Sequence, residues 1–161
     1  QTRSLETCNE ALILPLSRMG RGTMQIIAQK CLDYADVVVA RSPRWGLAHF
    51  SQARAHYVLG NIGAATQALQ SALDTAPNEG WIAQKRVLLA LDLMPFDMAQ
   101  DVFERDTLFL MANPVLSDWL ARLYVALPAR RARIVEIAET APAAHKRIFL
   151  SRAKFHLEAG A

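Results

Sequence analysis

The side chains that could carry chemistry are few, and they do not form a familiar constellation. Of the four histidines, His49 and His56 are seven residues apart and could share one face of a helix. A zinc site would need further cysteine, histidine or carboxylate ligands at short spacing, and none accompanies this pair. We therefore expect structural or solvent-facing histidines, and we predict no metal site.

Carboxylates gather in the second half of the chain, where Asp101, Glu104 and Asp106 follow one another closely. Asp101 and Glu104 have the spacing of neighbours on a helix, and paired acids can hydrolyse glycosidic bonds. No sign of a pocket accompanies them, so a solvated helix face is the better interpretation. The sequence also lacks the nucleophile elbow, the phosphate-binding loops, the zinc-protease motif and the calcium loop. We expect no catalytic residue and no cofactor.

The two cysteines, Cys8 and Cys31, match neither a redox motif nor a zinc-ligand spacing. In a reducing compartment they would be small buried side chains, whereas in the periplasm they could form a disulfide. Suppose that the flanking segments form an antiparallel hairpin that turns near Arg21. Cys8 then lies 13 residues before the turn and Cys31 lies 10 after it. The offset is about one helical turn, so both thiols reach a similar height and could face each other. Both alternatives stay open.

Charge is distributed unevenly, although the formal net charge is only +3. Residues 92–118 contain six acids and one base, and residues 122–161 contain eight bases and three acids. These stretches are either solvated helix faces that attract each other or, in the basic case, a surface for an acidic partner. No nucleic-acid-binding module or interleaved aromatic residue is present, which disfavours nucleic acid relative to an acidic protein or an anionic membrane. The candidate basic patch consists of Arg130, Arg131, Arg133, Lys146 and Arg147.

The elements that position these side chains are predicted to be helices throughout. Alanine and leucine make up 48 of the 161 residues, and runs of β-branched residues are nearly absent. Proline, glycine and asparagine separate the chain into segments with helical periodicity. The links are short and favour antiparallel neighbours, so we predict one all-α domain over residues 1–161. The expected helices are 23–40, 47–59, 64–75, 81–93, 97–111, 115–126, 129–140 and 143–158.

Apolar stretches in the chain are far shorter than the roughly 20 residues that a membrane-spanning helix needs. The chain begins at Gln1 rather than at a methionine. We therefore expect that an upstream segment was removed, and a signal peptide, a membrane anchor and simple trimming are the alternatives. An anchor would place the protein close to a membrane.

A repeat is visible in the first half of the chain. Pro43 and Pro77 are 34 residues apart, and so are Gly46 and Gly80. With this period and two helices per unit, residues 46–79 resemble a tetratricopeptide repeat. The family positions are matched by the turn residue Gly60, the small residues Ala53, Ala65 and Ala72, the apolar residue Leu69 and the terminal Pro77. The family's usual large apolar or aromatic residues are replaced by His49, Gln52 and His56.

The resemblance extends over residues 23–94 and implies antiparallel helical hairpins stacked as a short superhelix. Residues 95–161 are expected to add packing helices that cap the stack. In this family, exposed positions on the first helix of each repeat contact the ligand. Either these positions line a partner-binding groove here, or the apolar ones belong to the core. The matching residues are Leu47, Phe50, Arg54, Tyr57, Trp81, Gln84 and Leu88.

The repeat is followed by a helical tail rich in Trp, Leu and Arg, around Trp119, Leu120 and Arg122. In this respect the chain is also similar to short anchored helical proteins associated with bacterial exopolysaccharide or O-antigen assembly. Together the resemblances imply a non-catalytic scaffold that binds a protein partner in a bacterial multiprotein assembly. They favour the periplasmic side of the envelope over the cytoplasm. The alternatives are a binder of nucleic acid or an anionic surface through the basic C-terminal helices, and a small enzyme subunit with a shared site.

Overall fold

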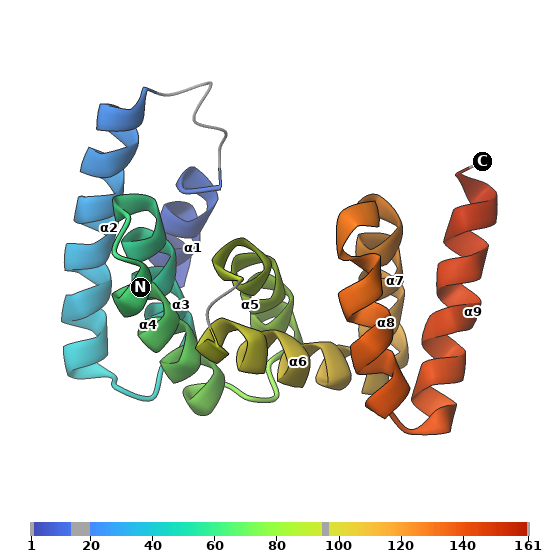
Figure 1. The fold of residues 1–161 in the computed structure, drawn as a ribbon. Helices are drawn as coiled ribbons and strands as arrows, with labels where there is room; N and C mark the ends of the chain where they lie inside the picture. Colours follow the sequence, from blue (N-terminus) through green and yellow to red (C-terminus); the bar gives the residue numbers. More distant parts are fainter. Residues whose placement is uncertain (1, 14–19, 95–96, 161) are drawn as a thin grey trace. The chain divides into compact units, whose positions relative to one another are not determined.

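A computed structural model describes residues 2–13, 20–94 and 97–160, and every regular element in these ranges is helical. The prediction of an all-α fold is confirmed, and the expected helices match the observed ones to within two residues at either end. No described helix is both long and apolar enough to span a bilayer. The elements are α1 (Thr2–Ala11), α2 (Arg21–Arg41), α3 (Gly46–Leu59), α4 (Ile62–Thr75), α5 (Gly80–Leu93), α6 (Asp97–Ala112), α7 (Pro114–Ala126), the 3-10 turn η1 (Pro128–Arg130), α8 (Arg131–Thr140) and α9 (Ala143–Ala159) (Figure 1).

The helices group into two compact units, Gln1–Val102 and Phe103–Ala161, and the boundary falls inside α6. Each unit has its own set of buried apolar side chains. The single domain over residues 1–161 stays a prediction.

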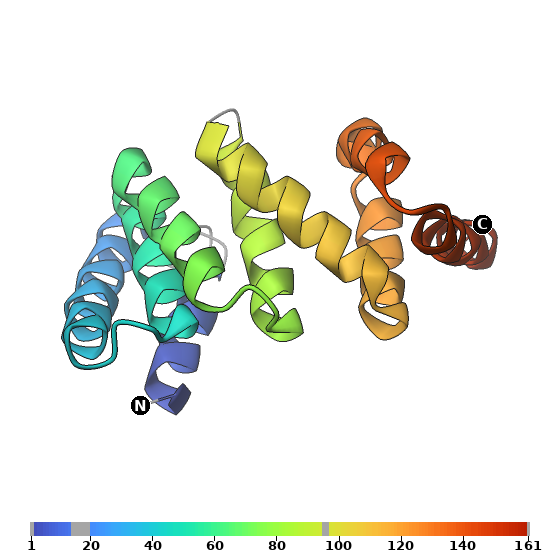
Figure 2. The same cartoon turned by 90° about the horizontal axis from the view of Figure 1, so that it is seen from below.

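In the first unit, α3 is the central helix. It packs against α2 and α4, and α1 and α5 also contact it (Figure 2). No residue of α3 is exposed, because the helix is surrounded by four others. This position requires small or apolar residues on almost every side of α3, which its sequence supplies at Leu47, Ala48, Phe50, Ala53 and Ala55.

The hairpin of α3 and α4 depends on two glycines. Gly60 ends α3 with a φ of 81°, a left-handed conformation that glycine adopts without steric cost. At the other end of the hairpin, Gly46 lies directly against the end of α4. A Cβ atom at Gly46 would overlap the Cβ of Ala76 and lie 3.2 Å from the carbonyl oxygen of Ala72. The close approach of the two helices therefore needs glycine at this position.

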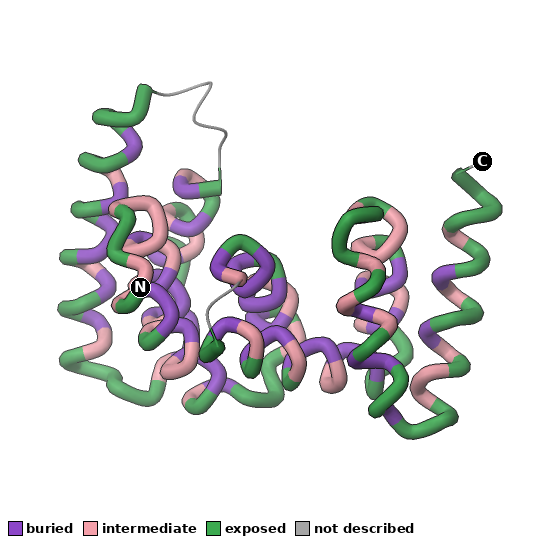
Figure 3. Tube along the Cα trace, in the orientation of Figure 1, coloured by how far each residue is buried: buried purple, intermediate pink, exposed green. Residues whose placement is uncertain are grey.

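In the second unit, α7 packs against α9, and η1 and α8 complete the bundle. The start of α7 is fixed by Asn113, whose Oδ1 accepts hydrogen bonds from the amides of Val115 and Leu116 at 3.0 and 3.2 Å. Tyr124 of α7 meets Phe149 of α9 edge to face, with ring centroids 5.7 Å apart. Burial on α9 is confined to one narrow side, and most of its length is exposed (Figure 3).

Candidate functional site

The residues predicted to line a groove are divided by the structure into a buried and an accessible group. Leu47 is 0% exposed and Phe50 is 2% exposed, because both lie inside the packing around α3. Neither side chain can contact a partner unless the core opens. Leu47 and Phe50 therefore belong to the core and do not line a partner-binding groove.

Arg54 is also enclosed, although the family pattern places it on a binding surface. Its Nη2 donates to the carbonyl oxygen of Leu12 at 3.2 Å, and its Nη1 lies 3.5 Å from Oδ2 of Asp92. The guanidinium stands 5.9 Å from the centre of the Tyr57 ring. Burial lowers the pKa of Arg54 below its ordinary value, and the charge of Asp92 partly offsets this effect. Arg54 therefore links the end of α1 to α3 and α5 within the fold.

On α5, three predicted residues remain accessible, and we call them the α5 surface: Trp81, Gln84 and Leu88. Trp81 and Leu88 are each 41% exposed, and Gln84 between them is partly exposed. A spacing of seven residues places Trp81 and Leu88 on the same side of the helix, two turns apart. Large exposed apolar side chains of this kind are typical anchors of protein interfaces.

The three polar replacements in the first helix of the repeat take part in local structure. Gln52 donates from Nε2 to Oδ1 of Asp36 at 2.7 Å, so it joins α3 to α2. Nδ1 of His49 lies 3.2 Å from Oε1 of Gln52, and its Nε2 lies 2.8 Å from the carbonyl oxygen of Pro43. Nδ1 of His56 is buried without a hydrogen-bond partner among the described residues. In those residues, no group of three or more potential metal ligands comes together.

Cys8 of α1 and Cys31 of α2 are joined in a disulfide, with their Cα atoms 5.6 Å apart. A second link fixes α1, because Nδ2 of Asn9 donates to Oγ of buried Ser51 in α3 at 3.0 Å. Helix α1 is therefore held against both α2 and α3. The core cluster around the disulfide contains Leu12, Met24, Ala28, Cys31, Leu32 and Ala55.

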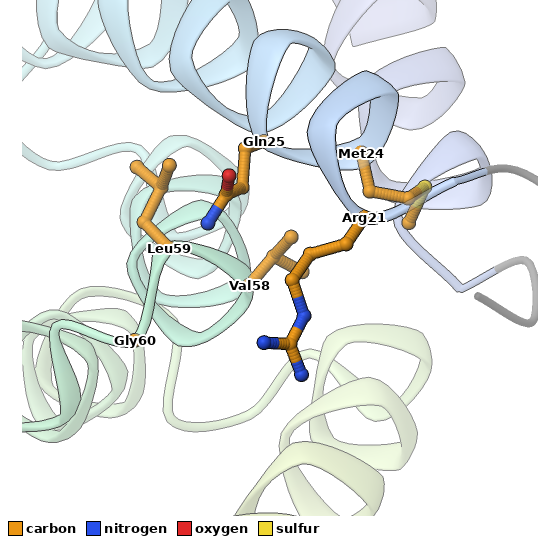
Figure 4. Close-up of a pocket in the computed structure, with 6 residues that line it drawn as sticks. All are labelled: Arg21, Met24, Gln25, Val58, Leu59 and Gly60. Carbon is orange, nitrogen blue, oxygen red and sulfur yellow. The ribbon is translucent and has the colours of Figure 1, made fainter.

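A hollow of about 280 Å³ opens where α2 begins and α3 ends. Met24 and the pair Val58 and Leu59 supply apolar surface that continues into the cluster around the disulfide. Figure 4 shows the Arg21 side chain extending past Val58, with Gln25 on the same helix above Leu59. The described residues of the lining offer apolar contact and one cation, and none of them carries a carboxylate, thiol or hydroxyl group.

Three members of the predicted basic patch already have partners. Arg131 donates from Nε and Nη2 to the carbonyl oxygens of Tyr124 and Val125 at 3.0 and 2.8 Å, and it stacks over the Tyr124 ring. Arg133 lies 2.7 Å from Glu136 and 3.7 Å from Glu104. Lys146 lies 2.7 Å from Glu139. In the described part of the chain, only Arg130 and Arg147 of the five stay exposed without an ion pair.

A different cluster of charges, which the sequence did not reveal, forms around Asp118 of α7. Its Oδ2 accepts hydrogen bonds from Arg122 at 2.9 and 2.5 Å, and its Oδ1 lies 3.2 Å from Arg152 and 2.9 Å from Nε2 of His156. The hydrogen bond with His156 is the main cause that lowers the pKa of Asp118 to about 2, and Arg122 adds to it. One carboxylate thus organises basic side chains from two helices.

Two charged residues in the described ranges are buried. Exposure was expected for the first of them, and no expectation was stated for the second. Asp106 is 0% exposed, so the expectation of a solvated acidic face over Asp101, Glu104 and Asp106 is wrong for this residue. Arg86 is also 0% exposed, and its Nη1 donates to the carbonyl oxygens of Ala72 and Ala76 at 3.2 and 3.0 Å. Helical periodicity could have indicated Arg86, because it shares the apolar face of α5 with Ile82.

Comparison with known proteins finds no matching family model, no matching curated protein and no matching solved structure.

Proposed function

We propose that the protein is a non-catalytic scaffold with a tetratricopeptide-like first unit, which binds a protein partner through the α5 surface. The partner would belong to a bacterial multiprotein assembly at the cell envelope. No cofactor takes part in this function.

The order of helix contacts in the first unit supports a repeat-like stack. Helix α2 packs on α3, which follows it in the chain, and α4 packs on α5 in the same way. The alternate helices α1, α3 and α5 also contact one another in sequence, α1 with α3 and α3 with α5. Stacked helical hairpins bury their apolar faces in this manner. The full burial of Ala65 and Ala72 agrees with small residues at the close contacts of such a stack.

The observation that carries the proposal is the exposure of Trp81 and Leu88 on one side of α5. Other exposed large apolar residues of the first unit, such as Ile26 and Val37 on α2, lie outside the predicted ligand-contacting positions, and no residue of α3 is exposed. Two large apolar residues with Gln84 between them offer anchors and a hydrogen-bonding group to a partner. The disulfide between Cys8 and Cys31 supports a compartment that is oxidising, such as the periplasm.

The test is affinity capture from the native host with the purified chain as bait, followed by mass spectrometry. We expect a protein that is captured by the unmodified chain and lost with the Trp81→Ala, Leu88→Ala double variant. The matched control is Ile26→Ala, because Ile26 is 61% exposed on α2 of the same unit but lies outside the α5 surface. Circular dichroism of both variants checks that the helices are retained.

Capture of the same protein by the double variant would refute the α5 surface as the binding site. Loss of capture with Ile26→Ala to the same extent would also refute it, because apolar exposure in general would then explain binding. If nucleic acid is recovered and its binding falls steeply between low and moderate salt, the phosphate-driven alternative replaces the proposal.

A further inference from the structure

The second unit contains a hollow of about 640 Å³ between α7 and α9, which we call the α9 hollow. Five of its lining residues belong to α9 and one, Asp118, belongs to α7. The lining residues are Asp118, Arg147, Ile148, Ser151, Arg152 and Phe155. We propose that the α9 hollow receives an apolar side chain from an acidic amphipathic helix of a partner protein.

The spacing of the lining residues is that of a receptor for another helix. Ile148, Ser151, Arg152 and Phe155 stand at positions i, i+3, i+4 and i+7 of α9. Four residues with this spacing form the hole that accepts one side chain from a facing helix in knobs-into-holes packing. Ser151 is small and exposed, so the centre of this hole is open. Helix α9 therefore presents an unfilled packing position beside α7, which contributes Asp118 to the lining.

Two of the four residues that form the hole, Ile148 and Phe155, are apolar, and both are at least partly accessible. Phe155 is 65% exposed, and its ring lies edge to face with the ring of His156 at 5.3 Å between centroids. His156 is hydrogen-bonded to Asp118, so the ring that Phe155 contacts is held in place. An exposed aromatic side chain in a positioned setting is a typical anchor for a protein partner.

Charge complementarity selects an acidic partner. The hollow is lined by two arginines, Arg147 and Arg152. A third, Arg122, bonds Asp118, which is the one carboxylate of this group. The three arginines and Asp118 together carry a net charge of +2. Arg147 is exposed and has no ion pair among the described residues, so it can pair with a carboxylate on a docked helix.

A protein helix fits this surface better than a continuous polyanion does. Asp118 lies in the hollow, and Glu158 lies further along α9 beside Lys154 at 3.7 Å. These carboxylates interrupt the basic surface that a row of phosphates would follow. A hole with apolar walls at Ile148 and Phe155, flanked by separate cations, instead matches a helix with apolar residues on one side and acids beside them.

The probe for the test is a capped and stapled peptide of about 15 residues, a length that supports a stable helix. It carries leucine at the core positions of a heptad and glutamate at most of the others. Binding to the complete chain is measured by fluorescence anisotropy. A version with lysine in place of glutamate tests charge, and a version with serine in place of leucine tests the apolar anchor.

We expect Phe155→Ala and Arg147→Glu each to weaken binding about tenfold, since both remove an anchor of the interface. Ser151→Tyr should abolish binding, because the new ring fills the hole. The matched control is Leu150→Ala, which changes a 48% exposed residue on another side of α9 and should leave affinity within about twofold. All four residues are partly or largely exposed to solvent, and circular dichroism verifies the fold of each variant.

The proposal is overturned if the peptide does not bind at millimolar concentration, or if the lysine version binds equally well. It is also overturned if Leu150→Ala weakens binding as much as Phe155→Ala.

Two further experiments test other occupants of the hollow: binding to anionic phosphatidylglycerol vesicles and sedimentation of the free chain. Phe155-dependent binding to vesicles without binding to the peptide would assign the hollow to membranes, and Phe155-dependent self-association would assign it to a second copy. The result does not depend on the α5 surface, so Trp81→Ala with Leu88→Ala should leave peptide affinity unchanged.

Discussion

Breaking the Cys8–Cys31 disulfide should measurably destabilise the first unit. The bond closes a segment with a sequence separation of 23 residues and joins α1 to α2. Cys31 is 4% exposed and lies in the cluster with Met24 and Leu32, so reduction leaves two thiols in a well-packed region. The native contacts can remain in place after reduction, and the main effect falls on the unfolded chain.

The size of the effect follows from the loss of chain entropy in the unfolded state. For a closed loop of 23 residues, the loop-closure expression gives about 3 kcal/mol at 25 °C. Helix α1 keeps its hydrogen bond from Asn9 to Ser51 and the contact of Leu12 with Arg54 after reduction. We therefore expect a lower free energy of unfolding and a native helical content that is largely unchanged.

The assay is urea denaturation followed by circular dichroism, with and without a phosphine reductant. A decrease of about 3 kcal/mol corresponds to a shift of about 1–3 M in the urea midpoint for typical slopes. The control is the Cys8→Ser, Cys31→Ser double variant, whose midpoint the reductant should not move. An unchanged midpoint of the unmodified chain after verified reduction would refute the entropic argument. Two reactive thiols in the unreduced, unfolded protein would show that the bond does not form, and would remove its support for the periplasm.

Two further substitutions test the packing and the charge cluster. Gly46→Ala should destabilise by about 1–3 kcal/mol because its Cβ overlaps that of Ala76, whereas Gly63→Ala, with nothing within 4 Å, should be neutral or slightly stabilising in thermal melts. Asp118→Asn should cost about 1–2 kcal/mol at pH 7, less than the full value of its pKa shift because the carboxylate is partly exposed to solvent. The pKa of Asp118 is lowered to about 2 from 3.8, so its stabilisation is present above about pH 4 and disappears as the pH falls through 2. Urea midpoints of the unmodified chain and the variant should therefore converge in acid, and a difference that persists at pH 2 would contradict this reasoning.

The helices were predictable because their signals are local. Glycine and proline mark the ends of α3 and α4, and Asn113 with Pro114 marks the start of α7. Apolar periodicity supplies the helical spans between these markers. The sequence therefore predicts which segments are helical without any knowledge of how they pack.

The environment of α3 was not predictable in the same way. The family pattern places Arg54 on an open surface, but α1 and α5 supply the carbonyl of Leu12 and the carboxylate of Asp92 that enclose it. These contacts depend on how α1 packs beside α3. A periodic pattern tells only that Phe50 and Arg54 lie on the same side of the helix, and not which neighbour covers that side.

The cluster around Asp118 illustrates the same limit over a greater sequence separation. Arg122 lies one turn away, and local spacing could have indicated its pairing with Asp118, since acid and base at i and i+4 attract each other. Arg152 and His156 come from α9, 34 and 38 residues later in the chain. Their partnership with Asp118 follows from the packing of α9 on α7, which no local motif encodes.

Arginine in this chain acts repeatedly as a cap for the end of another helix. Fourteen arginines and four lysines are present. Arg54 donates to Leu12 just after α1, Arg86 to Ala72 and Ala76 at the end of α4, and Arg131 to Tyr124 and Val125 at the end of α7. The last four carbonyl groups of a helix lack partners within it, and their partial negative charge favours a cation.

A planar guanidinium suits this task better than an ammonium group does, because it presents several donors in fixed directions and is less strongly hydrated. Arg86 and Arg131 each bond two carbonyl oxygens at the end of a helix, and Arg86 does so while fully buried. Basic residues that look like a binding patch in the sequence are therefore partly committed to the fold. The surface charge available to a partner is smaller than the count of arginines implies, and in the second unit it is concentrated on residues such as Arg147, at the rim of the α9 hollow.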